Sequence, residues 1–251
     1  MKIGQFEVVD RCLFWKEKKI LVVGDLHLGW EEHFMEQGWS FPRTQIEETL
    51  GLLRKVLQKT GKLKKIILLG DVKHYFAGVL KSEFEDFFNV VEVLKKSLLK
   101  NGKVIVTKGN HDNILEPVVR NYDFVKLVDF YVEDGVIFFH GDRFSFKKVG
   151  LKFYNKKIKV IVNGHFHPAV FISEKKGVKR ELYKCFLVGR AKELKKEMIL
   201  MPSFFPLVDG TDLGARDLNL EGRIDVKNFE VYVLTGGFGG VLGFGRVGGL
   251  V

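Results

Sequence analysis

The sequence predicts an α/β protein, because buried strands alternate with amphipathic helices and a polar cluster follows each strand. Five short runs are almost entirely apolar, which is typical of strands buried on both faces. These runs are residues 20–23, 66–69, 104–106, 136–139 and 160–162. The alternation predicts right-handed crossovers and a mixed or parallel sheet that is covered on both sides.

Two helices are indicated by apolar residues that recur at spacings of three and four. The first repeat is Ile46, Leu50, Leu53 and Leu57, and the second is Phe84, Phe87 or Phe88, Val91, Leu94 and Leu98. Each repeat marks one apolar face, so each helix is expected to pack on the sheet.

Beyond residue 167 we expect further strands, separated by charged turns, that form a second sheet. They are residues 169–173, 182–188 and 198–200. Residues 202–222 are expected to form a loop, and residues 229–234 a final strand. We expect one domain, residues 1–235, followed by a glycine-rich tail, 236–251, that is flexible or loosely docked.

Charge and cysteine content indicate the kind of partner and the cellular compartment. The 251 residues include 41 Lys and Arg against 31 Asp and Glu, a net charge of +10 that favours anionic partners. Cys12 and Cys185 stand far apart, which indicates a reducing compartment. The acidic residues Glu7 and Asp10 lie within the first twenty residues, which therefore lack the uninterrupted apolar stretch of a secretory signal. We therefore expect a cytoplasmic protein without a membrane span.

Five of the seven histidines directly follow apolar runs, and three Asp or Asn residues occupy the same kind of position. They are His27, His111, His140, His165 and His167, with Asp25, Asp71 and Asn110. Because ligands bind at the carboxyl edge of an α/β sheet, these side chains are expected to meet there. Imidazole, carboxylate and amide groups suit Mn²⁺, Fe²⁺ or Zn²⁺. The set is too large for one ion with an open position, so it predicts two ions about 3.5–4 Å apart.

The order of these motifs resembles that of the calcineurin-like metallophosphoesterases. The family pattern is DxH, GDxx(D/N/H), GNH(D/E), a lone His and GHxH. The matching segments are residues 25–27, 70–74, 109–112, His140 and 164–167. All five occur in order, whereas any one alone would be a weak signal. The resemblance implies a four-layer α/β/β/α sandwich of two mixed sheets flanked by helices.

The resemblance also implies roles. Asp25, His27 and His167 would hold one metal, while Asn110, His140 and His165 would hold the other, and Asp71 would bridge both. His111 would donate a proton to the leaving oxygen, with Asp112 orienting its ring. The expected activity is hydrolysis of phosphodiester or phosphomonoester bonds by a metal-bridging hydroxide. Mn²⁺ is the expected metal, with Fe²⁺, Zn²⁺ and Ni²⁺ as alternatives.

Within this family the chain looks most similar to archaeal SbcD-related and bacterial ligase-associated phosphoesterases, which implies a link to DNA repair. The supporting residues are 24–29, Gly38, 42–43 and 70–74. His74 departs from the wider pattern, where an acid is common, so it is a candidate for substrate binding or for a structural role. Arg43 is a candidate phosphate clamp or an ordinary salt-bridged residue. His33 is expected at the surface.

Two alternatives remain open. A DNA or RNA nuclease would use residues 143–159, which hold seven basic residues, no acid and interleaved aromatics. The same stretch also fits a solvated amphipathic helix with its aromatics in the core. A non-catalytic scaffold is the alternative of another class, although such proteins usually lose ligands, and here the whole set is present.

Overall fold

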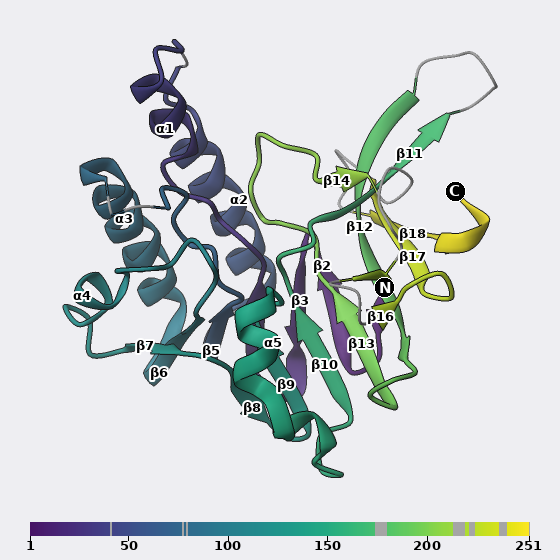
Figure 1. The fold of residues 1–251 in the computed structure, drawn as a ribbon. Helices are drawn as coiled ribbons and strands as arrows, with labels where there is room; N and C mark the ends of the chain where they lie inside the picture. Colours follow the sequence, from purple (N-terminus) through teal and green to yellow (C-terminus); the bar gives the residue numbers. More distant parts are fainter. Residues whose placement is uncertain are drawn as a thin grey trace.

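Two large mixed sheets pack face to face, with helices on their outer faces (Figure 1). The computed structural model describes residues 1–40, 42–76, 78, 80–173, 180–212, 219–220, 224–235 and 240–250. This arrangement confirms the predicted fold class of mixed sheets flanked by helices.

The first sheet is built from the N-terminal half of the chain in the order β1-β2-β3-β4-β5-β6-β7. Its strands are β1 Lys2–Ile3, β2 Phe6–Val9, β3 Cys12–Trp15, β4 Ile20–Val23, β5 Leu63–Leu68, β6 Leu98–Thr107 and β7 Val125–Val128. The strands from β1 to β4 pair antiparallel, and those from β4 to β7 pair parallel. The parallel part holds three of the five predicted apolar runs, in β4, β5 and β6.

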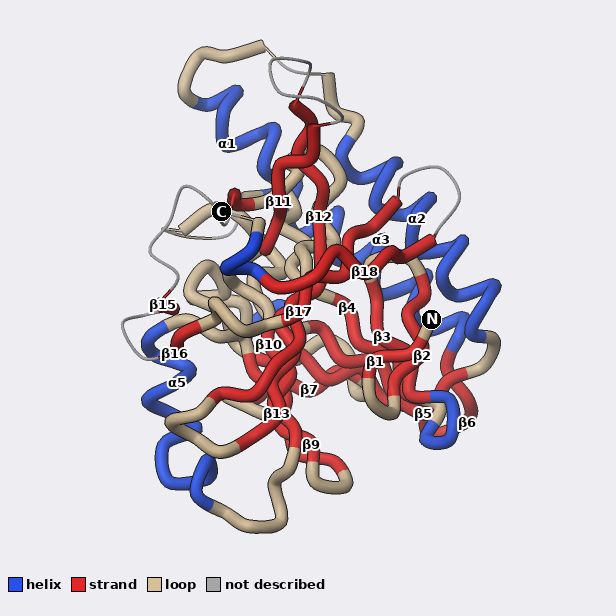
Figure 2. The backbone as a smooth tube through the Cα atoms, turned by 90° about the vertical axis from the view of Figure 1, so that its right-hand side faces the viewer, coloured by secondary structure: helices blue, strands red, loops and turns tan. Residues whose placement is uncertain are grey.

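The second sheet takes the remaining two runs, in β9 and β10, so the five strands do not share one sheet. Its order is β14-β11-β12-β13-β10-β9-β8, with β17 paired to β12 and β18 paired to β17 (Figure 2). The strands are β8 Tyr131–Glu133, β9 Val136–Phe139, β10 Val160–Asn163, β11 Pro168–Ser173, β12 Arg180–Ala191, β13 Lys196–Leu200, β14 Thr211–Asp212, β17 Glu230–Thr235 and β18 Gly240–Arg246. β9, β10 and β13 run parallel, so their carboxyl ends leave the sheet together.

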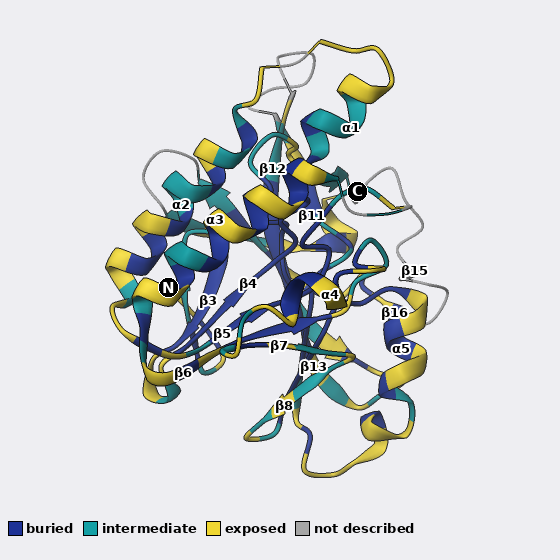
Figure 3. Ribbon diagram, turned by 90° about the vertical axis from the view of Figure 1, so that its left-hand side faces the viewer, coloured by how far each residue is buried: buried dark blue, intermediate teal, exposed yellow. Residues whose placement is uncertain are grey.

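The helices have clear buried and exposed faces (Figure 3). They are α1 Trp30–Glu36, α2 Gln45–Thr60, α3 Lys81–Ser97, α4 Glu116–Val119 and α5 Arg143–Val149, with 3₁₀ turns η1 Lys16–Lys18, η2 Gly150–Tyr154 and η4 Val247–Gly249. α2 and α3 match the predicted repeats. In α3 the buried face runs through Phe87, whereas Phe84 and Phe88 are exposed.

Three apolar cores separate the four layers. One lies between the first sheet and α2, α3 and α4, and includes Leu53, Phe87 and Val118. A second lies between the two sheets and includes Phe138 and Phe186. The third packs the outer face of the second sheet against α5, η2 and residues 224–229.

The C-terminal segment differs from the expected flexible or loosely docked tail. Residues 240–246 form β18, which pairs antiparallel with β17, so they extend the second sheet. The predicted loop at 202–222 likewise contains the two-residue strands β14 and β15 Asn219–Leu220, the latter paired with β16 Ile224–Asp225. Among the described residues, no helix combines the length and apolar character that a membrane crossing requires.

We predict that Phe138→Ala lowers the free energy of unfolding by about 3–5 kcal/mol, because Phe138 is fully buried between the sheets and its loss leaves a cavity. Urea denaturation followed by circular dichroism would measure this. Phe144→Ala is the matched control: that ring is 74% exposed, so a change of about 0.5 kcal/mol or less is expected. Equal effects of the two substitutions would contradict the assignment of the inter-sheet core.

Candidate metal centre

The carboxyl ends of β4, β5, β6, β9 and β10 are followed by the loops that carry the predicted site residues. Four of these residues have left-handed backbones: His27 (φ 47°), Asp71 (φ 45°), His165 (φ 69°) and His167 (φ 46°). This conformation is uncommon outside glycine, and strained residues cluster at functional sites. The loops therefore hold these side chains at a cost in local backbone energy.

Asp25, His27 and His167 form one compact group, which we call the first triad. One potential ligand atom of each lies within 4.8 Å of the others. His167 Nε2 lies 3.4 Å from Asp25 Oδ1. Burial, as the largest influence, lowers the pKa of His27 to about 3, so its ring is neutral and can donate an electron pair.

Asp71, His140 and His165 form the second triad, again with ligand atoms within 4.8 Å of one another. His140 Nε2 lies 3.2 Å from Asp71 Oδ2 and 3.1 Å from His165 Nδ1. Asn110 joins this group, because its Oδ1 is 3.1 Å from His140 Nε2.

Asp71 lies between the two triads. Its Oδ2 is 3.2 Å from His140 Nε2 and 3.9 Å from Nε2 of His27, which belongs to the first triad. Burial alone would raise the pKa of Asp71, but the nearby His140 and His27 hold it far below its usual range. Burial opposes a charge on His140 too, yet the Asp71 carboxylate raises its pKa to about 10. The cluster therefore favours positive charge between its carboxylates.

Both triads are assembled across the two sheets. Asp25 and His27 follow β4 of the first sheet, whereas their partner His167 follows β10 of the second. Asp71 follows β5 of the first sheet, whereas His140 and His165 follow β9 and β10. Neither sheet alone holds a complete triad.

Two glycines of the motifs make room for the carboxylates. A Cβ at Gly109 would lie 2.2 Å from Asp71 Oδ1, and one at Gly164 would lie 2.5 Å from Asp25 Oδ2. No side chain fits at either distance, so the backbone can approach the acids only where these residues are glycine.

The donor set fits divalent metal ions. His167 Nε2 is buried and makes no hydrogen bond among the described residues. His140 Nε2 lies 3.1 Å from His165 Nδ1. Two ring nitrogens can lie this close only if they share a hydrogen or bind a common cation, because their lone pairs otherwise repel each other. Imidazole nitrogens with carboxylate oxygens suit borderline divalent ions.

Comparison with known protein families shows which family this chain belongs to. The family described as calcineurin-like phosphoesterase matches residues 18–152, more than half of the chain. The chain belongs to this family. The match covers Asp25, His27, Asp71, Asn110 and His140 but ends before His165 and His167. A comparison with curated proteins found no match.

Solved structures similar to this calcineurin-like chain share little sequence with it. One is a protein of unknown function from Aquifex aeolicus, 18% identical, with a TM-score of 0.39 over 59% of this chain and 78% of that one. Another is a Vps29 double mutant from Entamoeba histolytica, 14% identical, with a TM-score of 0.35 over 90% and 96%. A third is described as a novel archaeal phosphodiesterase, 14% identical, with a TM-score of 0.35 over 90% and 98%.

His111 and His74 lie beside the two triads. Their rings stack with centroids 5.3 Å apart, and His111 Nδ1 is 2.6 Å from the His74 carbonyl oxygen. His111 Nε2 lies 4.0 Å from Asp71 Oδ2. His74 also shares a group of potential ligand atoms with His27 and His111, so it belongs to the site. Burial, followed by the nearby His111, lowers the pKa of His74 to about 4.

The Asp112 carboxylate, expected to orient the His111 ring, is hydrogen-bonded to backbone N–H groups in this structure, and its role towards His111 stays a prediction. The ring is held by the His74 carbonyl. Asp112 Oδ1 accepts the backbone N–H of Val72 at 2.9 Å, and its Oδ2 accepts that of Gly109 at 2.9 Å. Asp112 therefore ties the loop after β5 to the loop after β6, which positions Asp71 relative to Asn110. Burial and the neighbouring Asp71 raise the pKa of Asp112 to about 6.

Arg43 is engaged away from the triads. Its guanidinium lies 3.4 Å from Asp86 Oδ1 and 4.0 Å from Glu32 Oε2, and among the described residues it forms no hydrogen bond or ion pair with either triad. The salt-bridged interpretation of Arg43 therefore fits this structure, and a role in phosphate binding stays a prediction.

Three residues near the site were not singled out by sequence reasoning, or were placed elsewhere. His33 was expected at the surface, but its ring centroid lies 5.3 Å from that of His74. Glu83 accepts the backbone N–H groups of His74 and Tyr75. Gln45 Nε2 donates to the His27 carbonyl at 2.6 Å. All three lie on helices, and no motif in the sequence marks them.

We predict that Asp112→Asn lowers the free energy of unfolding by about 1–3 kcal/mol, because an amide nitrogen would face a backbone N–H that the carboxylate now satisfies. Urea denaturation of the metal-free protein measures this. Asp123→Asn, at an exposed position, is the control with little expected change. A variant with slower turnover but unchanged stability would instead favour a direct role in the chemistry.

Proposed function

We propose that the chain is a two-metal phosphoesterase that hydrolyses phosphodiester or phosphomonoester bonds. One observation carries the proposal: two triads of imidazole and carboxylate groups meet at Asp71, whose carboxylate lies between them. Structural sites that only bind one ion close around it, whereas paired open sites are typical of phosphoester hydrolysis. Membership of the calcineurin-like phosphoesterase family supports the same reaction class.

In this proposal the first triad would hold one ion, His140, His165 and Asn110 would hold the second, and Asp71 would be a ligand of both. Mn²⁺ is the proposed metal, with Fe²⁺, Zn²⁺ and Ni²⁺ as alternatives, since all accept nitrogen and oxygen ligands. When bound, such ions activate water for in-line attack and offset the charge on the phosphate oxygens.

His111 is proposed to give a proton to the leaving oxygen. The His74 carbonyl can only accept a hydrogen bond, so Nδ1 of His111 carries a hydrogen. Nε2 is therefore the nitrogen that exchanges a proton with the substrate. The stacked His74 ring fixes the plane of His111, which makes His74 a positioning residue.

A cavity beside the second triad supports nucleotide or nucleic-acid substrates. It has a volume of about 710 Å³ and reaches Asn110. Its walls include the exposed rings of Phe76 and Phe144. Among the described residues its charged groups are two lysines, Lys108 and Lys148, and four acids, Asp112, Glu116, Asp129 and Asp142. Aromatic faces stack on bases, so the two rings, rather than the charge of the cavity, favour a substrate that carries a base.

A nuclease is the second candidate, because the basic segment 143–159 does not bury all its aromatics. Phe146 and Phe153 pack in the core, as a structural helix requires. Phe144 and Tyr154 are 74% and 72% exposed, which leaves them available for stacking on an unpaired strand. Binding of a labelled oligonucleotide that weakens steeply with salt would favour this candidate.

We predict that the protein hydrolyses bis-p-nitrophenyl phosphate with Mn²⁺ and loses this activity in EDTA. Asp71→Asn should lower kcat/KM by about 10²–10³-fold or more, because the bridging charge is lost. Asp123→Asn, an exposed acid, is the matched control and should retain activity. No turnover with any of the four metals would favour the non-catalytic scaffold instead.

We further predict that His111→Ala keeps two ions per chain but lowers kcat by about 10²–10⁴-fold. The loss should be larger for an alkyl leaving group than for p-nitrophenolate, which departs without protonation. Elemental analysis gives the metal content, and His27→Ala is the comparison expected to lose metal. Loss of metal from His111→Ala would assign His111 to the ligands.

A further inference from the structure

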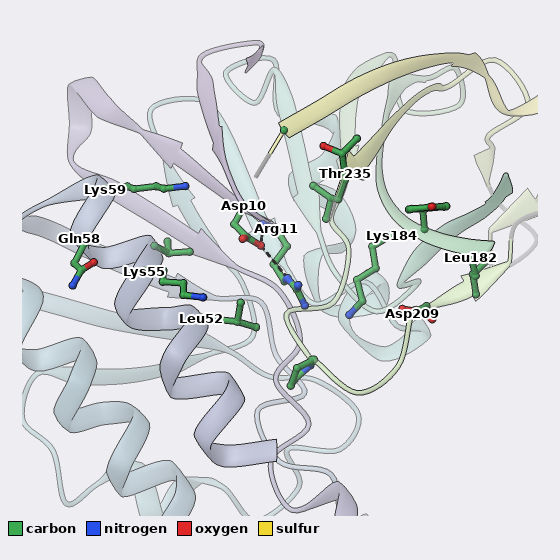
Figure 4. Close-up of a pocket in the computed structure, with 15 residues that line it drawn as sticks. Asp10, Arg11, Leu52, Lys55, Gln58, Lys59, Leu182, Lys184, Asp209 and Thr235 are labelled. Atoms are coloured by element: carbon green, nitrogen blue, oxygen red, sulfur yellow. Dashed lines mark hydrogen bonds and ion pairs between the residues drawn. The ribbon is translucent and has the colours of Figure 1, made fainter. Parts of the chain in front are cut away.

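A second cavity lies where α2, the turn between β2 and β3, and β12 meet. It has a volume of about 600 Å³, and none of the seven candidate metal ligands lines it. Figure 4 shows it between α2 and the strands of the second sheet. Sites of small organic ligands commonly have volumes in this range.

Four cations line this cavity, and they come from three separate elements. They are Arg11 from the β2–β3 turn, Lys55 and Lys59 from α2, and Lys184 from β12. The charged ends of Arg11, Lys55 and Lys184 point towards a common space in Figure 4. Of the residues that the structure describes, two acids, Asp10 and Asp209, line the same cavity.

The positive charge in the cavity is only partly neutralised. Asp10 is already engaged by Arg11, with 3.1 Å between Oδ1 and Nε. Among the described residues, neither Lys55 nor Lys59 makes a salt bridge. Burial, followed by the nearby Arg11, lowers the pKa of Lys184 to about 7, while Asp209, Asp25 and Asp10 act in the opposite direction. An anion in the cavity would pair with the unpaired ammonium groups of Lys55 and Lys59.

The remaining walls suit an organic body attached to the anion. Leu52, Leu182 and Leu234 line the cavity and are each half-buried. Apolar walls with a few convergent cations are typical of sites for small organic phosphates. A free inorganic ion would leave most of this volume unfilled, so a ligand of nucleotide size fits the cavity better.

The floor of the cavity is connected to the metal centre by hydrogen bonds. Lys184 is only 8% exposed, and its Nζ donates to Ser203 O, Ser203 Oγ and Phe205 O. The guanidinium of Arg11 donates to Phe204 O at 3.4 Å. From the other side, the N–H groups of Phe204 and Phe205 donate to the backbone carbonyl of Asp25 at 2.9 and 3.0 Å. Residues 203–205 thus join two cavity cations to a residue of the first triad.

We propose that this cavity is a second ligand site, which binds a nucleotide-sized organic phosphate through Arg11, Lys55 and Lys59. A ligand there would be linked through Arg11 to residues 203–205 and thereby to the loop of Asp25. The cavity is lined by none of the candidate metal ligands, so this proposal does not depend on the proposed phosphoesterase reaction.

The test uses AMP as the probe and isothermal titration calorimetry on the full chain, once with Mn²⁺ and once with EDTA. We expect a binding event in both conditions that Lys55→Ala/Lys59→Ala weakens about tenfold or more, equivalent to about 1.4 kcal/mol. Lys64→Ala/Lys100→Ala removes the same charge from two exposed positions outside the cavity and should bind like the wild type. His167→Ala should also retain the event.

The proposal is overturned if AMP does not bind in EDTA, or if both double variants bind it as the wild type does. Loss of the event in His167→Ala alone would place AMP at the metal centre instead. Hydrogen exchange tests the connection: AMP should slow exchange at the amides of residues 203–205 in the wild type but not in Lys55→Ala/Lys59→Ala. Binding without this protection would overturn the coupling to Asp25.

Discussion

The packing of one sheet against the other is the constraint on which the metal centre depends. Each triad takes residues from both sheets, so the separation of the sheets sets the separation of the ligand atoms. Fully buried side chains such as Phe138 and Phe186 fill the space between the sheets. Because close-packed interiors resist compression, this core acts as a spacer that holds the two halves of the site in register.

Electrostatics inside the cluster follow from this assembly. Two carboxylates, Asp25 and Asp71, are buried where water cannot solvate them, so they need positive partners. The surrounding imidazoles supply part of that charge, and divalent ions would supply more. The backbone also contributes, since Asp112 and the left-handed residues fix loops that would otherwise separate. The geometry of the cluster therefore depends on groups that lie outside both triads.

Much of the site could be predicted from local sequence, because apolar runs and the polar residues after them are short-range features. The helical repeat that includes Leu53 and Leu57 became α2, and the five motifs converged as expected. The sheet that each strand joins could not be predicted, since the runs at 20–23 and 136–139 have the same apolar character. The position of His33 depends on how α1 packs, and the partners of Asp112 depend on two loops meeting. Such contacts are long-range and leave no local pattern.

The order of the residues along the chain has a consequence for folding. The first-sheet members of the two triads, Asp25, His27 and Asp71, all precede residue 72, whereas the second-sheet members lie at 140 and beyond. Proteins are synthesised from the amino terminus, so the emerging first half carries only incomplete sites. Neither triad can close until the second sheet has emerged and docked. Binding of an ion by a full triad would therefore be a late event in the maturation of this protein.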